Sequence, residues 1–197
     1  MQWNNKYNYP KSTRSIFKGS RHYTVNQENL PSVTTILKAT ESEEKKAKLD
    51  EWKKRVGYKN AEVISREATN RGSSMHDYLE KFLSGKLNLD LLGDNTREKI
   101  MADQIIENGI RNKLSEIWGC EATLYYPGKY AGAADCIGIY ENKESLIDFK
   151  NANKPKKEEW IDDYYLQCAA YAMAHNTVYG TSITQGVILL CTKDNTF

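Results

Sequence analysis

The hydrophobic pattern of the chain changes its period near residue 120, and this change restricts the folds that the chain can adopt. Upstream, apolar residues recur at helical spacing; downstream, three strand-like segments follow one another with short links, at 121–126, 131–140 and 144–150. A helix is then expected over about 160–175 and a last strand over 186–190. This order predicts an α/β or α+β fold, in which helices flank a mixed central β-sheet.

The part before residue 119 is expected to hold an N-terminal hairpin in residues 1–30 and a mainly helical part over 31–118. With a sheet core over 119–197 these make a single domain, which is usual for 197 residues. The hairpin would turn at Gly19-Ser20, and Pro31-Ser32 would open the first helix. Further helices are expected over 41–55, over 60–83 with a break or a close backbone approach at Gly72, and over 97–118.

The formal net charge of the chain is only +2, so the local distribution of charge is more informative than the sum. Residues 1–27 contain basic but no acidic side chains, so this segment either lies against a phosphate backbone or forms a solvated hairpin. A transit peptide is not expected there, because the segment has no apolar h-region and makes no clean amphipathic helix. No apolar run approaches the roughly 20 residues of a membrane span, so no membrane association is expected.

The four cysteines show no metal-ligand spacing. Cys120, Cys136, Cys168 and Cys191 form no C-x-x-C pair, which argues against a zinc ribbon. Cys136 and Cys168 lie in apolar stretches and are expected to be reduced core residues. The expected compartment is therefore a reducing cytoplasm.

Two acidic residues and a lysine on neighbouring strands carry the main chemical signal. Asp148 and Lys150 lie two apart in a strand-like run and so share one face, and Asp135 lies in the preceding strand among small residues. A hairpin can bring the two carboxylates together, where they repel unless a cation such as Mg²⁺ lies between them. Such a metal lowers the pKa of a bound water, while Lys150 would orient or deprotonate that water or neutralise charge. The alternative is a surface ion pair at a strand end.

Two helical pairs with a spacing of four residues extend this site. His76 and Glu80 would share a face of one helix, where the histidine could ligate the metal; a packed or solvated histidine is the alternative. Gln167 and Tyr171 would share a face of the helix after the strands. A buried amide and phenol need polar partners, which a phosphate or Lys150 would supply; amphipathic packing is the alternative.

In this order, the motifs resemble those of the PD-(D/E)xK nuclease superfamily, with its restriction-endonuclease-like core. The block Arg71–Glu80 and the spacing of Gln167 and Tyr171 resemble the RecB-like branch. Pro31–Leu37 and the Arg71-Gly-Ser sequence look like the phage exonucleases related to the mitochondrial genome maintenance exonuclease. The resemblance covers roughly residues 30–192. Ala134 replaces the proline that gives the superfamily its name, and the second acid is Asp148 rather than glutamate; both are tolerated in this branch.

The resemblance implies a role for each of these residues. His76, Asp135, Asp148 and the Phe149 carbonyl would ligate Mg²⁺ or Mn²⁺, and Lys150 would be the catalytic lysine. Gln167 and Tyr171 would frame the site, and Glu80 would support the metal ligands. The cysteine spacing does not match that of relatives with an iron–sulfur cluster, so no cluster is expected.

The implied activity is hydrolysis of DNA, often from single-stranded ends, in phage replication, recombination or repair within the host cytoplasm. Phage or host replication and recombination proteins are expected partners. Two other hypotheses are a catalytically silent nucleic-acid-binding accessory module and a structure-selective endonuclease. Candidate DNA contacts are Arg71, Lys154, Lys156, Lys157 and the stacking residues Tyr164 and Tyr165, for which a solvated loop and core packing are the alternatives.

Overall fold

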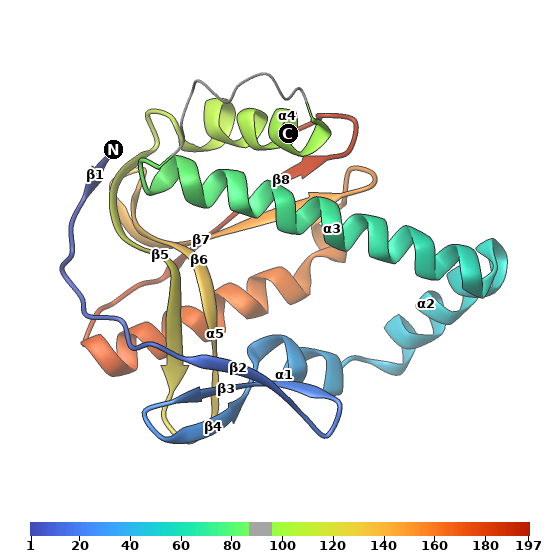
Figure 1. The fold of residues 1–197 in the computed structure, drawn as a ribbon, viewed down its shortest axis with the longest axis horizontal. Coiled ribbons are helices and arrows are strands. Elements are labelled where there is room, and N and C mark those ends of the chain that lie inside the picture. The colour runs from blue at the N-terminus through green and yellow to red at the C-terminus, as the bar shows by residue number, and fades with distance from the viewer. Residues whose placement is uncertain (87–95) are drawn as a thin grey trace.

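The computed structural model describes residues 1–86 and 96–197, and a five-stranded mixed sheet lies at its centre (Figure 1). The strand order is β1-β5-β6-β7-β8. β5, β6 and β7 form an antiparallel meander, whereas β1 and β8 pair in parallel with its two outer strands. The predicted mixed sheet is confirmed. Its strands are β1 (Gln2–Trp3), β5 (Leu114–Tyr126), β6 (Tyr130–Tyr140), β7 (Lys143–Ala152) and β8 (Gln185–Thr192).

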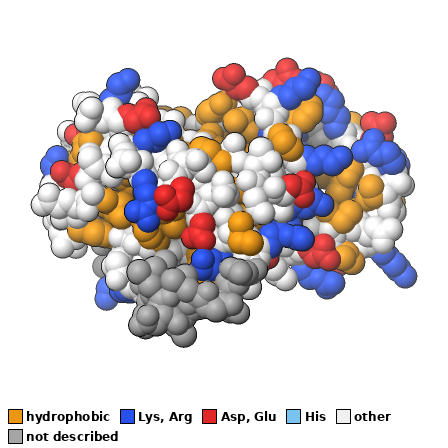
Figure 2. All heavy atoms as spheres, turned by 90° about the horizontal axis from the view of Figure 1, so that it is seen from above, with side chains coloured by type: hydrophobic (Ala, Val, Ile, Leu, Met, Phe, Trp, Pro, Cys, Tyr) orange, Lys and Arg blue, Asp and Glu red, His pale blue; other side chains and the backbone are white. Residues whose placement is uncertain are grey.

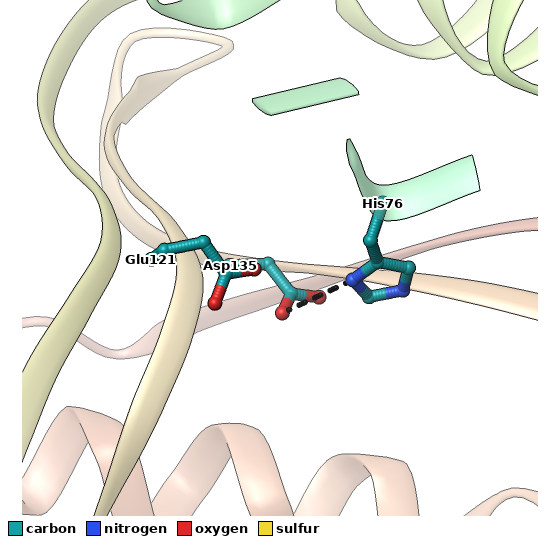
Figure 3. Close-up of side chains that lie close together, drawn as sticks. All are labelled: His76, Glu121 and Asp135. Carbon is teal, nitrogen blue, oxygen red and sulfur yellow. Dashed lines mark ion pairs between the residues drawn. The ribbon is translucent and has the colours of Figure 1, made fainter. Parts of the chain in front are cut away.

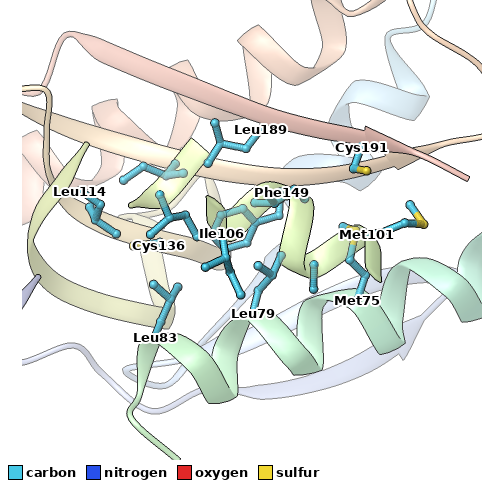
Figure 4. Close-up of a cluster of buried hydrophobic side chains, with 14 of the residues drawn as sticks. Met75, Leu79, Leu83, Met101, Ile106, Leu114, Cys136, Phe149, Leu189 and Cys191 are labelled. Atoms are coloured by element: carbon cyan, nitrogen blue, oxygen red, sulfur yellow. The ribbon is translucent and has the colours of Figure 1, made fainter. Parts of the chain in front are cut away.

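Helices cover both faces of this sheet. α3 (Tyr58–Leu83) and α4 (Arg97–Ile105) pack on one face around a buried cluster that includes Leu79 and Phe149 (Figure 4). α5 (Asp162–Tyr179), which follows a short 3-10 helix (Glu158–Trp160), packs on the other face around a second buried cluster. In the described ranges, the helices lack the length and apolar character needed to cross a membrane.

The N-terminal hairpin extends into a three-stranded antiparallel sheet. β2 (Thr13–Phe17) and β3 (Ser20–Val25) form the expected hairpin, and β4 (Glu28–Pro31) adds a strand that the sequence did not predict. Pro31 does not open a helix, because it is the last residue of β4. Ser32 instead caps α1 (Val33–Ala39), accepting a hydrogen bond from the Thr35 N–H at 3.0 Å.

The charged helix and the long helix are both present. α2 (Glu43–Val56) ends at Gly57, and α3 then runs without interruption through Gly72, so no break occurs there. A Cβ atom at position 72 would collide with the Asn151 side chain. The glycine therefore marks a close approach, but by a side chain of β7 rather than by backbone.

The prediction of one helix over 97–118 is wrong in its last part. The helix ends after a π-helical turn (Ile106–Ile110), and residues from Leu114 onward begin β5. Asn112 adopts a positive φ of 61°, which helix interiors do not accommodate. Leu114 and Ile117 lie three apart, which fits a helical face and not strand alternation. A register shift between Leu114 and Glu116 allows both to be buried in the same core although they belong to a strand.

β5 and β6 both change their faces at one level, where they bend away from the sheet toward the N-terminal strands (Figure 1). Cys120 and Cys136 pack against the α3-side cluster, whereas Ala122 and Ala134 belong to the α5-side cluster. Residues two apart share a face in a regular strand, so each strand is irregular between them. Glu121, at this level of β5, has a positive φ of 48°.

Candidate metal centre and active site

Asp135 and Asp148 meet where the β6–β7 ladder stops. The last paired residues are Cys136 and Ile147, each of which is the direct neighbour in sequence of one of the two aspartates. There the Asp135 side chain replaces the backbone ladder, since its Oδ2 accepts a hydrogen bond from the Phe149 N–H at 2.7 Å. The structure thus brings together the two carboxylates that the sequence placed on neighbouring strands.

Lys150 neutralises part of this charge. Its Nζ lies 2.5 Å from Asp148 Oδ2, and the Asp148 residue is only 4% exposed. The same Nζ donates to Gln167 Oε1 of α5 at 3.4 Å. Asp148 and Lys150 therefore share the α5 side of β7, while Ile147 and Phe149 pack in the α3-side cluster.

Burial dominates the ionisation of these three groups. It raises the pKa values of Asp135 and Asp148 above their ordinary range, and the charge of Lys150 only partly opposes this. Burial lowers the pKa of Lys150, but the two aspartates outweigh it and the net shift is upward. Lys150 is therefore protonated at neutral pH, which suits it to orient a water or neutralise charge rather than to accept a proton.

His76 reaches Asp135 from α3 (Figure 3). Its Nε2 lies 2.9 Å from the Phe149 carbonyl oxygen, and its Nδ1 lies 3.6 Å from Asp135 Oδ1. Burial, helped by Lys150, lowers the pKa of His76, so the neutral ring is favoured near pH 7. When Nε2–H donates to the Phe149 carbonyl, Nδ1 keeps a lone pair directed at Asp135, as a metal ligand requires.

Glu121 belongs to this group, although it was not predicted from the sequence. Ligand atoms of His76, Glu121 and Asp135 all lie within 4.8 Å of one another (Figure 3). The Glu121 residue as a whole is exposed, but its carboxyl group is partly buried. This burial and the negative charges of Asp135 and Glu80 raise the pKa of Glu121 to about 7. The signal was in the spacing: Glu121 and Asp135 are equidistant from Gly128, the expected turn of their hairpin.

These donors fit a divalent cation. Glu121 and Asp135 supply carboxylate oxygens and His76 a neutral nitrogen, the ligands that such ions take. Within the described ranges, Asp148 Oδ2 is a buried oxygen without a hydrogen bond, and its one charged contact is Lys150. Burial raises the pKa values of Glu121, Asp135 and Asp148, and a bound cation would favour their charged forms.

The helical pairs lie at different distances from this centre. Gln167 bonds Lys150, and Tyr171 is buried so close to β6 that a Cβ atom at Gly132 would collide with its hydroxyl. Burial raises the pKa of Tyr171, and a hydrogen bond with Gln167 opposes that shift. Glu80 is exposed on α3 and acts on the centre through its charge, by raising the pKa of Glu121.

The predicted DNA contacts divide into one buried and several exposed side chains. Arg71 is 7% exposed, and its guanidinium donates to Asn151 Oδ1 at 3.2 Å and Asn153 Oδ1 at 2.6 Å. It thereby ties α3, which carries His76, to the end of β7. Lys154, Lys156, Lys157 and Tyr165 are exposed, and Tyr164 is half-buried with Lys150 and Lys156 against its ring.

Basic and acidic side chains are interspersed over the face of the molecule shown in Figure 2. This agrees with the net charge of +2. An anionic ligand would therefore be attracted by the local arrangement around Lys150 and Lys156 rather than by a field of one sign over the whole surface.

The chain is similar to three curated proteins, each named mitochondrial genome maintenance exonuclease 1. It is 29% identical over 173 residues to the protein of Homo sapiens, 31% over 176 to that of Mus musculus, and 30% over 178 to that of Xenopus tropicalis. Each match covers 84% of this chain but 50%, 51% and 49% of the respective relative. The chain thus spans about half the length of these relatives, whose shared name suggests a nuclease family. No protein-family model matches it.

Proposed function

We propose that the chain is a metal-dependent DNA exonuclease of the PD-(D/E)xK type, which hydrolyses phosphodiester bonds at single-stranded ends. The observation that carries this proposal is the convergence of His76, Asp135, Asp148 and Lys150 from α3, β6 and β7. The shared name of the three relatives supports the activity, since an exonuclease removes nucleotides from chain ends.

In this proposal His76, Asp135 and Asp148 hold Mg²⁺ or Mn²⁺, with Glu121 and the Phe149 carbonyl beside them. The bound cation would lower the pKa of a water and neutralise charge on the phosphate. Protonated Lys150 stabilises the negative charge that develops on the phosphate oxygens as the bond breaks. Gln167 holds Lys150 Nζ toward α5, and Arg71 fixes the distance between the helix of His76 and the strand of Lys150.

Single-stranded DNA is the proposed substrate because the exposed groups next to the centre pair cations with aromatic rings. Lys156 Nζ lies 4.8 Å from the centre of the Tyr164 ring, and Lys157 Nζ lies 5.4 Å from that of the exposed Trp160. Unpaired bases stack on such rings while lysines neutralise the phosphates. The resemblance to phage exonucleases supports a role in phage replication, recombination or repair, in the host cytoplasm.

The test is cleavage of end-labelled linear and circular single-stranded DNA with Mg²⁺, Mn²⁺ or EDTA. The wild type should degrade the linear strand only, and only with metal, and Lys150→Ala should remove the activity. Lys143→Ala is the matched control, because Lys143 is exposed at the opposite end of the same strand. Cleavage of the circle would instead establish an endonuclease, and binding without cleavage in either metal would establish a silent binding module.

A further inference from the structure

A hollow between α1 and α5 lies directly beside the proposed active site and has no part in the chemistry described so far. Its volume is about 240 Å³. One side is lined by Thr34, Leu37 and Lys38 of α1 and by Glu41 in the segment that follows it, and the other by Asp163, Tyr164 and Gln167 of α5. The volume of the hollow is below the range of about 300–1,000 Å³ that is usual for pockets of drug-sized ligands, so the hollow suits a single planar group.

Two residues connect the hollow to the reacting centre. Gln167 lines the hollow and accepts a hydrogen bond from Lys150 Nζ at 3.4 Å. Tyr164 also lines it, and Lys150 Nζ lies 5.1 Å from the centre of its ring. A nucleotide whose phosphate lies at Lys150 therefore has its own sugar and base within reach of the hollow.

The lining of the hollow offers a base both apolar surface and hydrogen-bond acceptors. Leu37 and the Tyr164 ring offer apolar and aromatic surface, against which a base can pack. Glu41 and Asp163 place two carboxylates on opposite sides of the hollow, beside one lysine of its lining, Lys38. Asp163 also pairs with Lys45, whose Nζ lies 2.9 Å from its Oδ1. Carboxylates repel a phosphate and accept hydrogen bonds from the amino groups of bases.

We propose that this α1–α5 hollow binds the base of the nucleotide next to the cleaved phosphate and favours bases with an exocyclic amino group over thymine. The inference rests on the proposed nuclease function, whose substrate preference it specifies. Cytosine presents its N4 amino group as a donor, whereas thymine presents the O4 acceptor at that position. The thymine O4 atom, an acceptor, is repelled by the carboxylate of Glu41 or Asp163. Thymine is therefore the base that the hollow disfavours.

Oligo(dC) and oligo(dT) of equal length test the preference, because both are pyrimidine strands that differ in this group. Fluorescence anisotropy at pH 8 in EDTA measures binding without cleavage. The wild type should bind oligo(dC) about five- to tenfold more tightly than oligo(dT), which is the effect of one hydrogen-bonded contact to a base. Glu41→Gln and Asp163→Asn should each reduce that ratio, and the double variant should bring it below about twofold.

Two neighbouring acids supply the controls. Glu43 lies outside the hollow and pairs with Lys46 at 2.7 Å, and Asp162 is exposed beside Asp163. Glu43→Gln and Asp162→Asn should leave the ratio unchanged. Equal affinities in the wild type, or a ratio that survives the double variant, would overturn the proposal.

A parallel cleavage assay with Mg²⁺ and Mn²⁺ separates the two proposals. Cleavage with no difference between oligo(dC) and oligo(dT) would remove the base preference and leave the nuclease intact. A preference in binding that the double variant abolishes, without cleavage in either metal, would keep the base site and remove the nuclease.

Discussion

Glu121 and Asp135 lie opposite one another on β5 and β6, at the level where both strands change their faces. The pairs on either side, Cys120 with Cys136 and Ala122 with Ala134, keep the register, so the irregularity is local to this level. Two carboxylates come to lie beside His76 of α3 at this level. The bend of the long hairpin and the candidate metal centre are thus one feature.

Glu121→Gln should weaken binding of Mn²⁺. The substitution removes a carboxylate that lies among or next to the metal ligands and keeps the size of the side chain. The affinity for Mn²⁺ should therefore fall roughly 10–100-fold. Isothermal titration calorimetry of the metal alone measures this. Glu141→Gln, in the turn between β6 and β7, is the control. An unchanged affinity would show that Glu121 stands outside the cation site.

Binding of a divalent cation should release protons near pH 6.5. Burial and neighbouring acids raise the pKa of Glu121 to about 7, and burial also raises those of Asp135 and Asp148, so part of this group is protonated there. A cation displaces those protons, and its affinity should fall as pH decreases from 8 to 5. Calorimetry in two buffers of different ionisation enthalpy measures the number released. A buffer-independent enthalpy at pH 6.5 would contradict the prediction.

Asp135→Asn should stabilise the metal-free protein at pH 8. Because burial raises the folded-state pKa of Asp135, ionisation destabilises the folded state as pH rises from the ordinary carboxyl pKa, and the effect is complete above the folded-state value. The amide keeps the acceptor for the Phe149 N–H, so the free energy of unfolding should increase by about 1–2 kcal/mol at pH 8 and little at pH 4. Urea unfolding measures both values, with Asp194→Asn as control. A loss of stability at pH 8 would mean that the carboxylate is structurally required.

His175 should make the fold sensitive to acid. It is fully buried, with Tyr9 Oη 3.0 Å from Nε2 and Thr181 Oγ1 2.7 Å from Nδ1, and burial lowers its pKa to about 4. Its neutral form is favoured on folding, so this contribution is complete above pH 6.5 and is lost as pH falls through 4. The loss should amount to roughly 2–3 kcal/mol of unfolding free energy. His175→Gln should flatten this arm of the pH profile, and an unchanged profile would exclude the residue.

Arg71→Lys distinguishes a positioning residue from a DNA contact. An ammonium group cannot reproduce the two hydrogen bonds that the Arg71 guanidinium donates to Asn151 and Asn153. The distance between His76 and Lys150 should therefore no longer be fixed. We expect kcat to fall about 10–100-fold with little change in DNA affinity. Lys154→Ala should give the reverse, a weaker affinity and a smaller salt dependence. If Arg71→Lys behaves like Lys154→Ala, the residue contacts DNA as the sequence alone suggested.

The sequence predicted the parts of the fold in which one period dominates. The meander, α2 and α5 were expected because strand alternation or helical spacing is clear there, and Gly57 ended α2. The start of β5 was predicted as helix because the spacing of Leu114 and Ile117 is helical, and the register shift that buries both in a strand depends on pairing with β6. β4 was missed because four residues after a hairpin carry too little pattern.

The candidate site was predicted as far as strand pairing determines it. Alternation placed Asp148 and Lys150 on one face, and a hairpin placed Asp135 next to them. The approach of His76 and the burial of Arg71 depend on how α3 packs across β7, which is tertiary information. Glu121 could have been found by counting back from Gly128, whereas its left-handed backbone could not.

The edge of the sheet formed by β1 has a consequence for the order in which the protein folds. Gln2 and Trp3 pair with Glu116 and Ile117, more than a hundred residues away, and Trp3 Nε1 donates to the Leu83 carbonyl. On the ribosome, β1 is synthesised long before β5 and must wait unpaired until β5 has been made. Closing so large a loop slows folding. The helices should therefore form early, and the pairing of β1 with β5 should form last.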